Sequence, residues 1–126
     1  MSKLVLLVDD DQSLLECLSE LIRQEAINVV CAENGDEALH WLRHSGRLPD
    51  FIFIDLKMPV MDGETFLEEK SKAGTAIAGI PVLVLTAGRT DVRGRSVVGV
   101  LRKPFGIGDF LPYVESLARG TALPEA

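Results

Sequence analysis

The sequence predicts an α/β domain built on a parallel sheet of five strands, with helices on both faces. Short apolar runs such as Phe51-Ile52-Phe53-Ile54 lack polar alternation, which is typical of strands buried on both faces. Amphipathic stretches with helical spacing separate these runs. Strands that alternate with helices pair in parallel through right-handed crossovers, so the carboxyl ends of all the strands are expected at one edge of the sheet.

The first half of the chain contains two strand–helix units. Leu4–Val8 is an unbroken aliphatic run and is predicted to be the first strand. Gln12–Glu25 is the first helix, because aliphatic side chains recur with helical spacing at Leu14, Leu18, Leu21 and Ile22. Cys17 is in phase with this stripe, so we expect it to be buried. Asn28–Ala32 is the second strand, and Asp36–Ser45 is a helix that turns Ala38, Leu39 and Leu42 inward.

The second half adds three strands and two helices. Phe51–Ile54 is the third strand, and the helix Glu64–Ala73 follows it. Ile80–Leu85 is a fourth strand of unbroken apolar residues, and Val97–Leu101 is the fifth. Gly108–Ala118 is the last helix, with one apolar side formed by Phe110, Leu111, Val114 and Leu117.

No ordinary helix is predicted between the fourth and fifth strands. The segment Gly88–Ser96 offers little apolar surface with which a helix could pack on the sheet, so a loop or at most one turn is expected. Residues 89–103 carry five basic side chains against Asp91, a net charge of +4 in a chain whose net charge is −6. Two interpretations stay open, a solvated loop and a basic docking surface for an acidic partner.

Composition is that of one ordinary globular domain. The 126 residues are 47% hydrophobic and 25% charged, and they are numerous enough to bury a single core. The negative net charge argues against nucleic acid or an anionic membrane as a partner. No targeting or membrane-spanning segment is visible. The two cysteines, Cys17 and Cys31, form no CxxC pair, so reduced thiols and a cytoplasmic location are expected.

Reactive side chains follow the predicted strands where the strands end. Asp9 and Asp10 follow the first, Asp55 the third, Thr86 ends the fourth and Lys103 follows the fifth. Carboxylates that share a pocket repel one another unless a cation is present, and oxygen ligands with room for water suit Mg²⁺. A hydroxyl and an ammonium could hold the oxygens of a phosphoryl group. The pattern predicts an aspartate nucleophile that takes phosphate.

These residues resemble the receiver domain of two-component response regulators, which has the flavodoxin-like (βα)5 fold of the chemotaxis receiver. The matching pieces are "LLVDDD", "ENGDEAL", "DFIFIDLKMPVMDG", "PVLVLTA" and "LRKPF", in order along almost the whole chain. The resemblance implies strand order 2-1-3-4-5, with the fourth helix short or missing here. Residues 1–119 are then the receiver, and 120–126 are a tail or the stub of a linker.

The resemblance also implies roles for single residues. Asp55 is the phosphoacceptor, Lys103 contacts the phosphoryl oxygens, and Thr86 turns inward to bind them. The implied Mg²⁺ ligands are Asp10, Asp55, the backbone carbonyl of Lys57 and, through water, Asp9. The bond between Lys103 and Pro104 is expected to be cis.

The implied function is a signalling one. The domain would take phosphate from a sensor histidine kinase or a histidine phosphotransfer protein and then change its binding to a downstream protein that the sequence does not identify. Such a domain is not a conventional enzyme, since it catalyses only its own phosphorylation and dephosphorylation. Val100 stands where the family usually has an aromatic switch residue, which leaves the coupling to Thr86 open.

Several alternatives stay open. The domain could be a pseudo-receiver scaffold that takes no phosphate. A haloacid-dehalogenase-type phosphatase also uses an aspartate nucleophile, but that family needs an acid where Lys57 stands. Asp11 is expected to cap the first helix, although a slip of one residue would make Asp10 and Asp11 the working pair. His40 and His44 are spaced to share a metal but lack an evident third ligand, so solvent exposure is expected.

Overall fold

The computed structural model describes residues 2–88, 91–92, 94 and 96–124. It confirms a five-stranded parallel sheet in the order β2-β1-β3-β4-β5. The strands are β1 (Leu4–Val8), β2 (Asn28–Ala32), β3 (Phe51–Asp55), β4 (Val82–Thr86) and β5 (Val97–Arg102). The helices are α1 (Gln12–Gln24), α2 (Gly35–His44), α3 (Gly63–Ser71), α4 (Thr75–Ala78) and α5 (Ile107–Arg119). None of these helices is long and apolar enough to cross a membrane.

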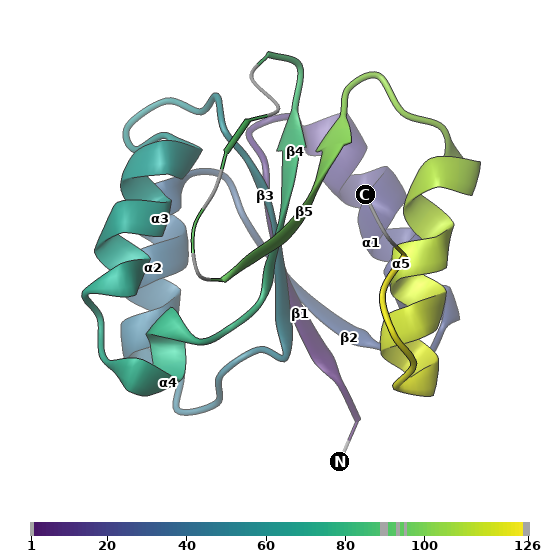
Figure 1. The fold of residues 1–126 in the computed structure, drawn as a ribbon, viewed down its shortest axis with the longest axis horizontal. Helices are drawn as coiled ribbons and strands as arrows, with labels where there is room; N and C mark the ends of the chain where they lie inside the picture. Colours follow the sequence, from purple (N-terminus) through teal and green to yellow (C-terminus); the bar gives the residue numbers. More distant parts are fainter. Residues whose placement is uncertain (1, 89–90, 93, 95, 125–126) are drawn as a thin grey trace.

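The sheet is covered on both faces, as Figure 1 shows. Helices α1 and α5 pack on one face, and α2, α3 and the short α4 lie on the other. Each face has its own hydrophobic cluster, one containing Phe53 and Phe110 and the other Ile54 and Phe66. Because β1, β3 and β4 have a neighbouring strand on each side, all of their residues are buried. This burial explains why their sequences show no polar alternation.

The buried face of α1 differs from the predicted one. Leu18 and Ile22 are buried as expected, but Leu15 and Ser19 complete that face, and Leu14 and Leu21 lie at its margin. Cys17 is exposed, so the expectation that it is buried was wrong. The apolar stripe is wide enough to permit two orientations about the helix axis, and packing against the sheet selects between them.

The segment before β4 holds a helical turn that the sequence analysis missed. Helix α3 ends at Ser71, and α4 covers only Thr75–Ala78. Strand β4 therefore begins at Val82, not at Ile80, since the amide of Ile80 closes the α4 turn on the carbonyl of Ile77. The buried Lys70 side chain ties α3 to this turn through a 2.8 Å hydrogen bond from Nζ to the Ala78 carbonyl. Burial lowers the pKa of Lys70 to about 8.

Between β4 and β5, no described residue is helical, as expected for this segment. The described residue Val92 packs against the α2–α3 side of the core. Pairing between the two strands shifts register after Val82, which leaves Val98 without a partner and 45% exposed. The predicted basic surface relies mainly on Arg89, Arg93 and Arg95, which lie outside the described residues, so that interpretation stays a prediction.

Gly63 at the start of α3 allows the loop after β3 to close tightly. A Cβ at this position would lie 2.5 Å from the Asp55 carbonyl oxygen and 2.7 Å from the Leu56 Cα. The Gly63 amide also donates a 2.9 Å hydrogen bond to the Leu56 carbonyl. From the sequence, Gly63 is expected only to allow a sharp entry to the helix; the close approach of two backbone segments beside Asp55 appears in the structure.

We therefore expect Gly63→Ala to lower the free energy of unfolding by about 2 kcal/mol or more, because the added methyl group must displace the backbone of β3. Gly108→Ala in α5 is the matched control. A Cβ at Gly108 meets nothing within 4 Å, so alanine should leave stability unchanged or raise it by roughly 0.5 kcal/mol. Urea unfolding of both variants measures the difference. Equal stability of the two would contradict the close approach.

Candidate functional site

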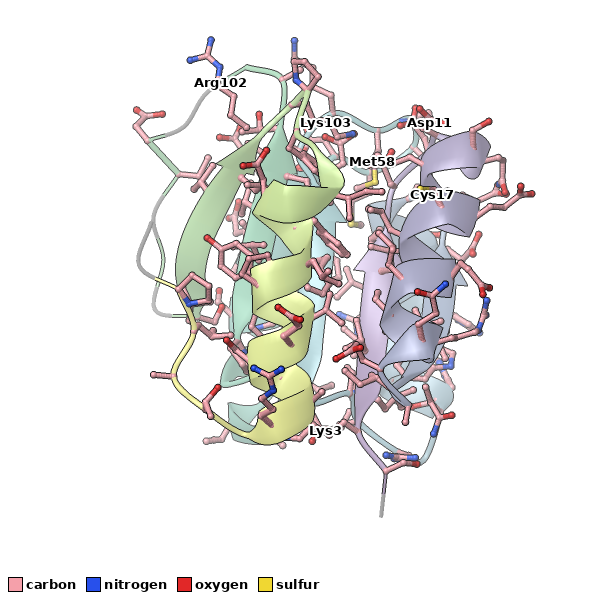
Figure 2. The ribbon with its side chains drawn as sticks, turned by 90° about the vertical axis from the view of Figure 1, so that its right-hand side faces the viewer. Lys3, Asp11, Cys17, Met58, Arg102 and Lys103 are labelled. Atoms are coloured by element: carbon pink, nitrogen blue, oxygen red, sulfur yellow. The ribbon has the colours of Figure 1, made fainter. Side chains whose placement is uncertain are left out.

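The carboxyl edge of the sheet brings together the side chains that the sequence places at the strand ends. Asp9 follows β1, Asp55 is the last residue of the adjacent β3, Thr86 ends β4 and Lys103 follows β5. Figure 2 shows this end of the molecule, where Lys103 lies at the same end as Asp11 and Met58 and opposite Lys3. In open parallel sheets this edge is the usual position of a binding site.

Three carboxylates form the centre of the site. Oxygen atoms of Asp9, Asp10 and Asp55 lie within 4.8 Å of one another, and within the described part of the chain no other group of three or more acidic, histidine or cysteine side chains is as close. Asp9 and Asp55 are buried, with relative exposures of 0% and 6%, whereas Asp10 is exposed. The site is therefore open to solvent on the Asp10 side.

Asp11 belongs to the helix and not to this cluster. Its carboxylate accepts a 3.1 Å hydrogen bond from the Leu14 amide, which caps α1 as predicted. The Asp11 amide in turn donates to Asp9 Oδ1 at 3.0 Å, which holds that buried carboxylate in place. These contacts favour Asp9 and Asp10 as the pair in the site over the slipped pair of Asp10 and Asp11.

Lys103 places a positive charge next to two of the carboxylates. Its Nζ lies 2.7 Å from Asp9 Oδ2 and 3.4 Å from Asp55 Oδ2. Burial disfavours the charged ammonium, but the hydrogen bond to Asp9 and the charges of Asp9 and Asp55 outweigh that effect and raise the pKa of Lys103. The Lys103–Pro104 peptide bond is cis, as the resemblance implied.

The surroundings of the Asp55 carboxylate affect its pKa in opposite directions. Burial and the charge of Asp9 raise its pKa, although Lys103 and the Lys57 amide partly oppose that change. The Lys57 amide lies 3.4 Å from Asp55 Oδ1, a long hydrogen bond, and the Lys57 side chain is exposed. The Asp55 carboxyl therefore holds its proton more readily than an ordinary aspartate, and a cation bound nearby would oppose this by stabilising the ionised form.

Thr86 joins the site to the β4–β5 connection. Its side chain is buried, and its Oγ1 accepts a 3.0 Å hydrogen bond from the Gly88 amide. Its carbonyl accepts a 2.7 Å hydrogen bond from the Lys103 amide, so the two strand ends are directly linked. Val100 packs on the same side of the sheet, opposite Val84. An aliphatic side chain therefore occupies the place of the aromatic switch.

A cavity of about 540 Å³ opens beside the carboxylates. Its lining residues are Asp10, Leu56, Lys57, Met58, Asp62, Glu64 and Thr86. The sequence analysis missed Asp62 and Glu64, although both lie in the "MDGE" stretch that follows Asp55. Asp62 also caps α3, since its Oδ1 accepts a 2.8 Å hydrogen bond from the Thr65 amide.

The donor set fits Mg²⁺. All three side chains offer hard carboxylate oxygens, and the exposure of Asp10 together with the adjoining cavity leaves room for the water ligands that Mg²⁺ retains. A dication would also offset the repulsion between carboxylates that one ammonium cannot fully neutralise. The site can therefore hold a small dication next to the buried carboxylate of Asp55.

Comparison with known proteins identifies the family of the chain. The family model for the response regulator receiver domain matches residues 5–115. A transcriptional regulatory protein CpxR homolog of Haemophilus influenzae is 37% identical over 131 residues, which cover 98% of this chain and 53% of the relative. The chain thus spans about half the length of that relative.

Solved structures show the same fold. The chemotaxis response regulator CheY4 of Vibrio cholerae has a TM-score of 0.79 at 26% identity, over 93% of this chain and 99% of that one. The HemR receiver domain of Leptospira biflexa, in its non-phosphorylated form, has a TM-score of 0.78 at 27% identity, over 99% and 100%. The strand order, the acidic edge and the family match lead to one conclusion: this chain belongs to the response regulator receiver domain family.

Proposed function

We propose that the chain is a phosphoacceptor in a two-component signalling pathway and that Asp55 receives the phosphoryl group. The carrying observation is the position of Asp55, buried at the end of β3 within 4.8 Å of two other carboxylates and 3.4 Å from the Lys103 ammonium. A phosphohistidine on a sensor kinase or a phosphotransfer protein is the proposed donor. The P–N bond to histidine breaks, and a P–O bond to an Asp55 carboxylate oxygen forms.

Asp10, Asp55 and the Lys57 carbonyl are the proposed Mg²⁺ ligands, with Asp9 acting through a bound water. When bound, the ion supplies the positive charge that lets an anionic carboxylate approach an anionic phosphoryl group. Asp9 holds Lys103 by the 2.7 Å contact, so the ammonium is already directed at the site. Lys103 then binds a phosphoryl oxygen, because it already touches Asp55, where the group attaches.

Thr86 is the proposed link from the site to the protein surface. Its hydroxyl accepts from the Gly88 amide. If the hydroxyl turns toward the phosphoryl group, that hydrogen bond breaks. Gly88, at the start of the β4–β5 connection, then loses this contact with β4 and can change its conformation. Because Val100 offers no aromatic ring to rotate, this route differs from one that depends on an aromatic switch. The downstream partner would sense the changed connection through a shift between two conformations.

A pseudo-receiver scaffold, the alternative to a phosphoacceptor, would take no phosphate, so a phosphorylation assay distinguishes the two. Incubation with acetyl phosphate and Mg²⁺, followed by intact-mass measurement, should give one phosphoryl adduct on the wild-type chain. Asp55→Asn should abolish the adduct, because the amide is a poor nucleophile and carries no charge. An adduct that persists in Asp55→Asn would place the acceptor elsewhere, and its absence from the wild-type chain would favour the scaffold.

Metal dependence separates the two neighbouring aspartates. Asp10→Ala should weaken Mg²⁺ binding and slow phosphorylation together, since it removes a proposed ligand. Asp11→Ala is the matched control: it should retain both properties and lose about 1 kcal/mol of stability through the missing helix cap. Calorimetric titration with Mg²⁺ and the adduct assay measure these effects. Loss of binding in Asp11→Ala would show that the slipped pair, Asp10 and Asp11, is the working one.

A further inference from the structure

We propose that Glu37, His40 and His44 on α2 form a second metal site, separate from the acidic pocket, that binds a transition-metal dication such as Zn²⁺, Ni²⁺ or Cu²⁺. The three residues lie on successive turns of one face of α2. Imidazole nitrogen is a preferred ligand for these ions, whereas Mg²⁺ prefers oxygen ligands. The two sites would therefore select different metals.

The two histidines are already side by side. Both side chains are exposed, as the sequence analysis expected, and their ring centroids are 4.3 Å apart with a tilt of 30°. Nδ1 of His44 lies 2.8 Å from the His40 carbonyl oxygen. If that nitrogen carries the proton it donates to the carbonyl, and Nε2 is then free to bind a metal. Histidine ligands are commonly oriented by such a bond from the other ring nitrogen to a backbone carbonyl.

Glu37 supplies the third ligand that the sequence analysis did not identify. Surface hollows of about 510 Å³ and 350 Å³ adjoin this part of α2, and Glu37, His40 and His44 are the three residues that line both. The Glu37 carboxylate is not yet within 4.8 Å of both histidine nitrogens, since no such group is found among the described side chains. The side chain is exposed and would have to change rotamer to join them, and holding it in the new rotamer would cost side-chain entropy.

The surroundings permit a dication but offer few other ligands. Asp36 and Arg43 line one hollow with the triad, and their charges offset each other. Cys31 lines the other hollow, yet its sulfur lies 3.0 Å from Ser19 Oγ of α1, which packs on the opposite face of the sheet. The thiol is therefore turned away from the histidines. Water would complete the coordination, as is usual for an exposed site.

The test is calorimetric titration of the full chain with Zn²⁺ in the presence of excess Mg²⁺, which occupies the carboxylates and does not compete for imidazole. One Zn²⁺ is expected per chain. His40→Ala and His44→Ala should each weaken binding by about tenfold or more, and Glu37→Gln should weaken it less. Cys17→Ser/Cys31→Ser is the control and should bind as the wild-type chain does.

Nitrogen NMR of the histidine rings identifies the atoms involved. Zn²⁺ should shift Nε2 of His44 and one ring nitrogen of His40, and circular dichroism should show that each variant keeps its helices. Zn²⁺ affinity that is unchanged in His40→Ala/His44→Ala would overturn the proposal, as would absence of binding by the wild-type chain. Because phosphorylation of Asp55 is measured separately by mass, failure of one site is distinguishable from failure of the other.

Discussion

The contact of Lys103 with Asp9 and Asp55 is the interaction on which the site depends. Two buried carboxylates from adjacent strands would repel each other strongly without a positive charge between them. Lys103 supplies that charge from the far end of the chain, at 2.7 Å from one carboxylate and 3.4 Å from the other. The sheet order makes the contact possible, because β1 and β3 are neighbours and β5 follows β4 at one side. The fold and the site therefore depend on each other. The strand order brings Asp9 and Asp55 together, and the positive charge of Lys103 offsets the repulsion between these buried carboxylates.

The β4–β5 side is where this receiver departs from the usual pattern of the family. Among the described residues, none between the two strands is helical, and Val100 occupies the place of an aromatic switch. The hydrogen bonds of Thr86 to Gly88 and to Lys103 nevertheless connect the site directly to that side. In the proposed function, a signal would pass through the backbone at the end of β4 without a rotating ring. In this chain the proposed change in partner binding depends on the hydrogen bonds of Thr86 more than on side chains of a helix between β4 and β5.

Much of the fold could be predicted from the sequence because unbroken apolar runs and the helices between them carry strong periodic signals. The bounds of β1 and β2 are as predicted, and Asp55 lies at a strand end because the run "FIFI" stops there. The site residues at the strand ends follow from topology, which places Asp9, Asp55, Thr86 and Lys103 at one edge.

What could not be predicted depends on packing between distant segments. The apolar stripe of α1 permits more than one orientation, so the exposure of Cys17 was settled only by contact with the sheet. The α4 turn has no periodic signal, since four residues are too few to show one. The requirement for glycine at position 63 comes from the backbone at Asp55 and Leu56, eight and seven residues earlier in the chain. Glu37 escaped notice because its relation to the histidines appears only when the helix face and both hollows are known.

The most direct test of the central claim is a crystal structure of the protein with Mg²⁺ and beryllofluoride, a stable analogue of a phosphoryl group on a carboxylate. We expect beryllium on an Asp55 oxygen and Lys103 Nζ within hydrogen-bond distance of a fluoride. The Gly88 amide should then be separated from Thr86 Oγ1. Beryllofluoride on another residue, or Lys103 bound to Asp9 alone while the analogue is in place, would contradict the role assigned to the lysine and to the carboxylates it holds.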